Sequence, residues 1–173
     1  IEDWAKVTFI VPPRMDEYIA VNMEIQGIFQ NYGSPNDIYP YSIDEGFIDL
    51  SSSLNYFVPD KQLSRKQKLD LISARIQRDI WRQTGIYSTV GMSNANPLLA
   101  KLALDNDAKK TPTMRANWSY EDVEQKVWAI PNMTNFWGIG KRMEKRFNTL
   151  GIHSIKDLAN ANPDILKKEL GVA

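Results

Sequence analysis

Apolar residues recur at helical spacing in two long segments of the chain. In the segment over residues 11–33, the apolar positions that share one helical face are Tyr18, Val21, Ile25, Ile28, Phe29 and Tyr32. Gly33 follows this face as a stop signal. In the segment over residues 65–85, Ser64 and Gln67 form a capping-box pattern. The apolar stripe of this second segment consists of Leu69, Ile72, Ile76 and Ile80. Both segments are therefore predicted to be amphipathic helices.

Runs of β-branched and aromatic residues predict strands around and after these helices. The candidate strands are DIYPYSI (37–43), FIDLS (47–51) and IYSTVGMS (86–93). Pro40 places its run at an edge or a strand end, because proline cannot donate to a ladder. Asn96 and Pro97 then form the start of a further helix, and Ser119 with Asp122 starts another short one. This mixed order predicts an α+β fold, with helices packed on one face of a largely antiparallel sheet.

The last part of the chain follows a different pattern. It contains no convincing strand, and its short helical segments are separated by Gly138–Gly140, Gly151 and Asn162–Pro163. We therefore expect a small all-α unit, with a domain boundary within residues 117–131.

Composition narrows the classes of protein that fit this pattern. Of 173 residues, 43% are hydrophobic and 24% are charged, which is typical of a globular domain. The chain has no cysteine, which excludes disulfides and thiolate metal sites and favours a reducing compartment, the cytoplasm. No apolar run approaches the length of a membrane span, so nothing predicts a membrane partner. Basic and acidic residues both number 21, so the net charge gives no sign of an anionic partner.

Two adjacent acids, Asp44 and Glu45, interrupt the most apolar strand-like stretch and are followed by Gly46. In a straight strand one of them would point into a core, because neighbouring side chains face opposite ways. If DEG is instead the bend of a hairpin, both carboxylates can point towards one Mg²⁺ site, since Mg²⁺ binds one or two protein carboxylates together with substrate phosphates. These residue types are also ordinary turn formers, and the pattern alone favours an ordinary turn.

A second constellation lies at Gly138–Ile139–Gly140. It has the form of a helix-hairpin-helix, in which a glycine turn allows close approach and the next helix presents free N–H groups to an anion. The basic residues just beyond the turn are Lys141, Arg142, Lys145 and Arg146. The alternative is a tight turn beside a solvated basic face. The combination favours sequence-independent binding to nucleic-acid phosphates.

The same stretches resemble a known family. The matching motifs, in chain order, are Ser42–Glu45 followed by Phe47–Asp49, then Gly91–Ser93 with Leu98–Ala103, Asp105 and Ala108–Lys109, and finally Trp137–Gly140. Together they resemble the Y-family DNA polymerases, most closely the bacterial UmuC-like branch. Their order and spacing over nearly the whole chain favour metal binding by the paired acids over the ordinary turn. Gly46 stands where the family more often has alanine or serine, which adds backbone freedom beside the acids.

The resemblance implies a role for each matched residue. Asp44 would bridge two Mg²⁺ ions, and Glu45 would hold the catalytic ion and help to position the primer 3′-hydroxyl. Lys109 would contact the triphosphate of the incoming nucleotide, with the neighbouring Lys110 as the alternative. The residues that would contact duplex DNA are Gly138, Ile139, Gly140, Lys141 and Arg142.

The resemblance also implies the domain organisation. Residues 1–117 would be the palm, with the end of the fingers at about 1–13, and residues 118–173 would be the thumb. The N-terminal strand with a third metal-binding Asp, most of the fingers and the little finger have no counterpart. The chain is therefore expected to be part of a translesion polymerase and inactive alone.

The implied partners are primer–template DNA, deoxynucleoside triphosphates, and a sliding clamp or recombinase. Two alternatives remain open at this point. One is a non-catalytic DNA-binding module that uses the helix-hairpin-helix. The other is a nucleotide cyclase with a palm-like sheet, although the trailing helix-hairpin-helix counts against it.

Overall fold

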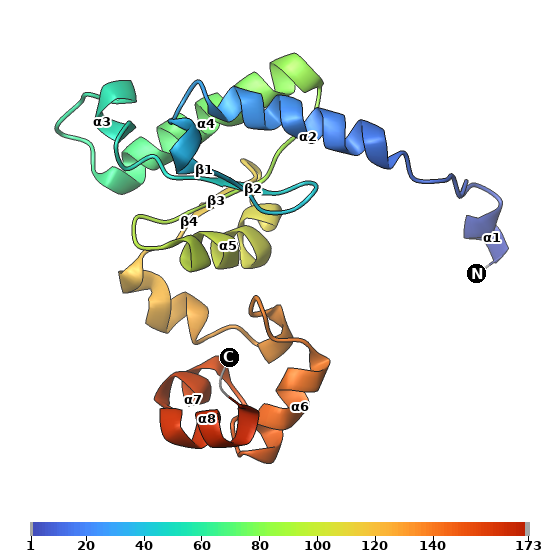
Figure 1. Cartoon of the computed structure of the whole chain (residues 1–173), viewed down its shortest axis with the longest axis vertical. Helices are drawn as coiled ribbons and strands as arrows, with labels where there is room; N and C mark the ends of the chain where they lie inside the picture. Colours follow the sequence, from blue (N-terminus) through green and yellow to red (C-terminus); the bar gives the residue numbers. More distant parts are fainter. Residues whose placement is uncertain (1, 172–173) are drawn as a thin grey trace. The chain divides into compact units, whose positions relative to one another are not determined.

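The computed structural model describes residues 2–171, and the chain forms two compact units, Ile1–Ser53 and Leu54–Ala173. Figure 1 traces the chain through both units. The expected palm–thumb boundary at residues 117–131 falls inside the second unit, and it stays a prediction. The outermost domain limits, residues 1 and 173, lie outside the described residues.

The first unit consists of one long helix and a small hairpin. Its elements are α1 (Glu2–Ala5), α2 (Met15–Phe29), the 3-10 turn η1 (Pro35–Asp37), β1 (Ile38–Pro40) and β2 (Gly46–Ile48). The strands pair antiparallel, as predicted, with Tyr39 opposite Phe47 and Pro40 opposite Gly46. Pro40 is the last residue of β1, the position that its missing N–H group allows.

The second unit begins with helices around a second pair of strands. Its first elements are α3 (Leu54–Phe57), α4 (Arg65–Thr84), β3 (Val90–Met92), α5 (Pro97–Asn106), the 3-10 turn η2 (Ala108–Lys110) and β4 (Arg115–Asn117). Ser64 and Gln67 form the predicted capping box of α4, and Gly85 ends the helix at φ +72°. Asn96 caps α5 by accepting a hydrogen bond from the N–H group of Leu99.

The pairing of β3 with β4 differs from the expected antiparallel sheet, because the two strands are parallel. A parallel pair needs a long crossover connection, and α5 supplies it between the two strands. The sequence pattern also missed β4 itself, which is only three residues long.

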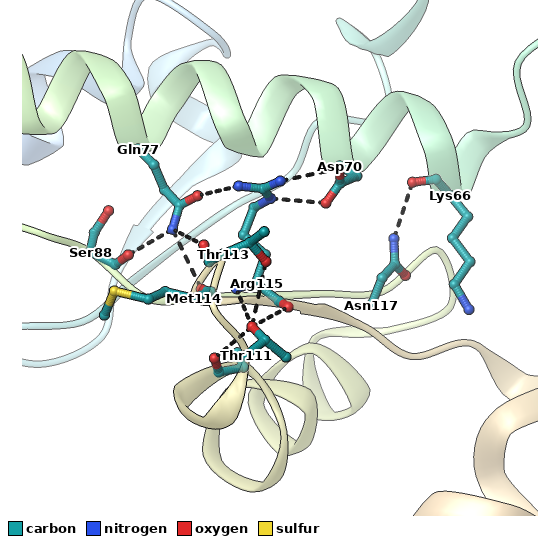
Figure 2. A network of polar contacts seen from close by, with 10 residues as sticks. Lys66, Asp70, Gln77, Ser88, Thr111, Thr113, Met114, Arg115 and Asn117 are labelled. Carbon is teal, nitrogen blue, oxygen red and sulfur yellow. Dashed lines mark hydrogen bonds and ion pairs between the residues drawn. The ribbon is translucent and has the colours of Figure 1, made fainter.

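Helices cover both sides of this parallel pair, whereas the sequence predicted helices on one face. Figures 1 and 2 show α4 on one side of the strands and α5 on the other. Side chains at alternate positions of a strand point to the same face, and Arg115 and Asn117 of β4 both form hydrogen bonds with α4. Gly91 instead lies against α5, where a Cβ atom would come within 2.6 Å of the backbone nitrogen of Leu104.

Within the described residues, no strand follows β4. The remaining elements are the turns η3 (Tyr120–Asp122), η4 (a π turn, Val123–Val127) and η5 (Met133–Asn135), then α6 (Lys141–Thr149), α7 (Ile155–Asn160) and α8 (Pro163–Leu170). One hydrophobic core joins α5 and β4 to these later elements; it includes Leu102, Ala116, Trp118, Val127, Ile139 and Phe147. This shared core explains why residues on both sides of the expected domain boundary belong to one compact unit. None of the helices in the described range is long and apolar enough to cross a membrane.

Candidate active site and nucleic-acid interface

Asp44 and Glu45 lie in the turn between β1 and β2, so they do form the bend of a hairpin. The backbone N–H groups of Tyr41 and Ser42 both donate to the carbonyl oxygen of Glu45, at 3.0 and 3.1 Å, and close the turn. The Ser42 hydroxyl donates to Oδ1 of Asp44 at 3.0 Å. Asp44 is exposed and Glu45 is half-buried. Strand alternation therefore does not apply here, and neither carboxylate needs to enter a core.

Helix α2 supports this turn through two amide side chains. Nδ2 of Asn22 donates to the carbonyl oxygen of Ser42 at 3.3 Å, and Nε2 of Gln26 donates to Oδ1 of Asn22 at 3.3 Å. A Cβ atom on Gly46 would lie 2.6 Å from Nε2 of Gln26. The glycine therefore leaves space for the Gln26 amide, a reason that differs from the backbone freedom expected from the sequence.

The donor chemistry of the turn suits a hard cation. Its two carboxylates match the one or two that Mg²⁺ takes from protein when phosphates supply further oxygen ligands. Within residues 2–171, no group of three or more acidic, histidine or cysteine side chains is placed to hold a metal ion. The turn thus offers two carboxylate ligands to a metal ion. The remaining ligands would have to come from groups other than the acids of residues 2–171.

The two candidate lysines at the end of α5 differ in their contacts. Nζ of Lys109 lies 3.4 Å from a carboxylate oxygen of Asp105, and Nζ of Lys101 lies 3.2 Å from the same carboxylate. The side chain of Lys110 forms no hydrogen bond or ion pair with another residue in the described part of the chain, and it is exposed. Only Lys109 therefore has to release an ion pair before it can bind an anion.

The Gly138–Gly140 turn leads directly into α6. Gly138 has φ +88°, a conformation that favours glycine, and Gly140 has an ordinary φ of −90° as the N-cap residue. Ile139 is buried in the core at 8% exposure, so only its backbone is available to a partner. Lys141 and Arg142 are exposed in the first turn of α6. The helix expected before the turn is a single 3-10 turn, η5.

A polar network that the sequence did not reveal holds β4 against α4 (Figure 2). The guanidinium group of Arg115 donates to both carboxylate oxygens of Asp70, at 2.9 and 3.4 Å, and to Oε1 of Gln77 at 2.9 Å. Nε2 of Gln77 donates in turn to the carbonyl oxygen of Ser88 at 2.7 Å. Asp70 and Arg115 are 45 residues apart, and the sequence contains no local signal for such a pair.

The same network reaches the turn that carries the lysines. The Thr111 hydroxyl accepts a hydrogen bond from the N–H group of Arg115 at 3.1 Å and lies 3.0 Å from the carbonyl oxygen of Ala108, the first residue of η2. The position of Lys109 and Lys110 thus depends on β4, and through Arg115 on α4.

Asp122 carries the clearest electrostatic perturbation. Burial raises its pKa, but hydrogen bonds from the backbone N–H of Ser119 and from Lys66 outweigh that effect and lower the pKa to about 2. The two donors lie 2.9 and 3.2 Å from Oδ2 of Asp122. The capped start predicted at Ser119 and Asp122 is therefore confirmed, and it is a capping box that opens the 3-10 turn η3.

The fold is similar to that of part of a solved DinB structure. Comparison with the crystal structure of DinB from Sulfolobus solfataricus gives a TM-score of 0.72 at 24% identity, covering 96% of this chain and 45% of that one. The chain belongs to the impB/mucB/samB family, whose pattern matches residues 2–105. This match confirms the resemblance to Y-family translesion polymerases that was inferred from the sequence motifs.

Two curated relatives align with most of the chain. One is a putative UV-damage repair protein, UvrX, of Bacillus subtilis (strain 168), which is 37% identical over 163 residues. The other is DNA polymerase IV 2 of Halalkalibacterium halodurans, which is 32% identical over 163 residues. Both alignments cover 94% of this chain, but only 36% and 37% of the relatives. The chain therefore spans little more than a third of the length of these relatives.

Proposed function

We propose that this chain is the palm and thumb part of a translesion DNA polymerase that uses two Mg²⁺ ions for template-directed nucleotidyl transfer. The observation that carries the proposal is the carboxylate pair Asp44–Glu45, held in a hairpin turn by α2. Membership of the impB/mucB/samB family and relatives named for DNA repair and DNA polymerase IV support it.

In this proposal, the acidic residues of the turn bind the metal ions. Asp44 would contact both metal ions and Glu45 the catalytic ion, and bound Mg²⁺ would neutralise charge that develops on the transferred phosphoryl group. The hydrogen bond from Ser42 to Oδ1 of Asp44 fixes one carboxylate oxygen and leaves the other for a ligand. Lys109 would exchange its ion pair with Asp105 for a contact to the triphosphate.

The proposed DNA contact is made by the glycine turn and the start of α6. Gly138, Ile139 and Gly140 would bring backbone close to duplex phosphates, while Lys141 and Arg142 add positive charge. Because such contacts are to phosphates, binding is expected to be independent of sequence and sensitive to salt. A sliding clamp or recombinase as a further partner, and a cytoplasmic location, stay predictions from the sequence.

The decisive test replaces Asp44 in the full-length protein. Asp44→Ala is expected to abolish primer extension while leaving the affinity for primer–template DNA nearly intact, because the turn lacks a metal ligand but the phosphate contacts remain. Glu24→Ala is the matched control, since it removes an exposed carboxylate from α2. Retained extension in Asp44→Ala would contradict the role assigned to this residue.

We further propose that the 173-residue chain alone does not extend a primer. Its described residues gather no third carboxylate around Asp44 and Glu45. Primer extension by the isolated chain, assayed with Mg²⁺ and all four deoxynucleotides, would contradict this proposal. The alternative of a non-catalytic DNA-binding module predicts instead that full-length protein tolerates Asp44→Ala in every assay.

A further inference from the structure

A cleft of about 740 Å³ lies in the second unit, where the end of α5 and η2 meets the glycine turn. Residues from both sides line it, among them Asp105, Asn106, Lys110, Trp137, Gly138 and Gly140. Nδ2 of Asn106 donates to the carbonyl oxygen of Asn135 at 3.2 Å and so ties one wall to the other. The spacing of the two walls is therefore fixed by a bond within this unit.

The charges in and around this cleft favour an anion. Among the described residues, Asp105 is the one acid that lines it, and it is already paired with Lys101 and Lys109. Lys110 lines the same cleft, and its side chain has no partner in the described part of the chain. Its ammonium group is thus available to a ligand without first breaking an ion pair.

Gly140 gives an independent reason to expect a close ligand. Its φ of −90° is open to any residue, and a Cβ atom built there meets nothing within 4 Å. Neither the backbone conformation nor packing against residues 2–171 therefore requires a glycine at this position. A glycine that the fold does not need leaves the backbone open to the close approach of another molecule. Gly140 lines the cleft that Lys110 faces.

We propose that this cleft holds one phosphodiester of a duplex DNA strand, with Lys110 as its ionic contact and the Gly138–Gly140 backbone as its floor. The inference rests on the proposed function, because it adds a residue from η2 to the DNA contact of the glycine turn. A phosphodiester fits better than a nucleoside triphosphate, because the single unpaired lysine of the cleft matches one negative charge, whereas a triphosphate carries several. Trp137, which is 46% exposed, lines the cleft as an apolar wall for the adjoining deoxyribose.

The test measures binding of this chain to a short fluorescein-labelled DNA duplex by anisotropy at several salt concentrations. Lys110→Ala is expected to weaken binding several-fold and to reduce the slope of log K against log salt by about 0.9, the value for one lost phosphate contact. Lys110→Arg should restore the slope, because it restores the charge. Lys61→Ala is the matched control, an exposed lysine of the same unit that does not line the cleft.

The outcomes separate this inference from the proposed function. If the unaltered chain binds with a steep salt dependence and Lys110→Ala matches the Lys61→Ala control, the inference is wrong and the proposed DNA contact stands. If the unaltered chain shows no salt-dependent binding, both are wrong. If Lys110→Ala instead loses affinity for a deoxynucleoside triphosphate with an unchanged DNA slope, the ligand of Lys110 is the triphosphate, and the inference is overturned.

Discussion

Replacing Arg115 by methionine tests whether the network between β4 and α4 stabilises the second unit. Arg115 is largely buried, with a side chain that is 17% exposed, whereas the Asp70 side chain is 49% exposed. After the change, water can solvate Asp70, so the lost ion pair contributes only about 0.5 kcal/mol. Oε1 of Gln77 is part-buried and loses its charged donor, which costs about 1.5 kcal/mol. Methionine retains much of the apolar stem, so the expected total is about 2 kcal/mol.

The assay is urea unfolding of the chain followed by circular dichroism, with a thermal scan as a second measure. For a cooperative unit of the size of Leu54–Ala173, about 2 kcal/mol corresponds to a decrease in Tm of roughly 8 °C. Asp70→Asn is the matched control, because it weakens only the exposed end of the network. Its expected cost is about 0.5 kcal/mol.

The stability losses of Arg115→Met and Asp70→Asn are compared to separate the buried bond from the exposed ion pair. The buried bond from Arg115 to Gln77 is expected to contribute more to stability than the exposed ion pair with Asp70. If Arg115→Met costs no more than Asp70→Asn, the network contributes nothing beyond a surface ion pair, which refutes the expectation. The Arg115→Met, Asp70→Asn double variant should cost little more than Arg115→Met alone, since Asp70 has then already lost its partner.

Three further predictions concern two glycines and an acid. Gly91→Ala should destabilise the chain by about 2 kcal/mol or more in urea unfolding, because the new methyl group would meet the backbone of α5 at Ala100 and Leu104. Gly140→Ala should change stability by less than about 0.5 kcal/mol but reduce DNA affinity several-fold in the anisotropy assay; undiminished affinity would argue against close approach at this turn. Asp122→Asn should cost about 2 kcal/mol at pH 7, since the folded-state pKa of about 2 lies below an unfolded value of about 3.9. That stabilisation is complete above about pH 5 and is lost progressively as the pH falls to about 1, so a difference between wild type and variant that stays constant over this range would contradict the assignment.

Local hydrogen bonding explains which features could be predicted from the sequence. The capping boxes at Ser64 and Ser119, and the N-cap at Asn96, involve residues three positions apart, so the pattern of side chains specifies them directly. The bend at Asp44 is equally local, because its closing bonds join Tyr41 and Ser42 to the next few residues. The family motifs add that this bend carries a candidate metal site, which the residues of the turn alone did not favour.

The predictions that failed depended on contacts between distant segments. The direction of β3 relative to β4 follows from where the chain returns after α5, and the strand-like runs contain no information on that path. The reason for Gly46 lies in Gln26, which is 20 residues away, so the sequence suggested backbone freedom where the structure shows close packing.

Short-range hydrogen bonds and ordered motifs encode the long helices α2 and α4, the hairpin bend with its paired acids, and membership of the impB/mucB/samB family, so the sequence alone predicts these features. The place of Lys110 beside the glycine turn depends instead on tertiary contacts. Lys109 lies 3.4 Å from Asp105, whereas Lys110 lines the cleft beside the glycine turn. Adjacent residues in a 3-10 turn point in different directions, so Lys109 pairs with an acid four residues earlier, whereas the cleft that Lys110 lines exists because the later glycine turn packs beside η2.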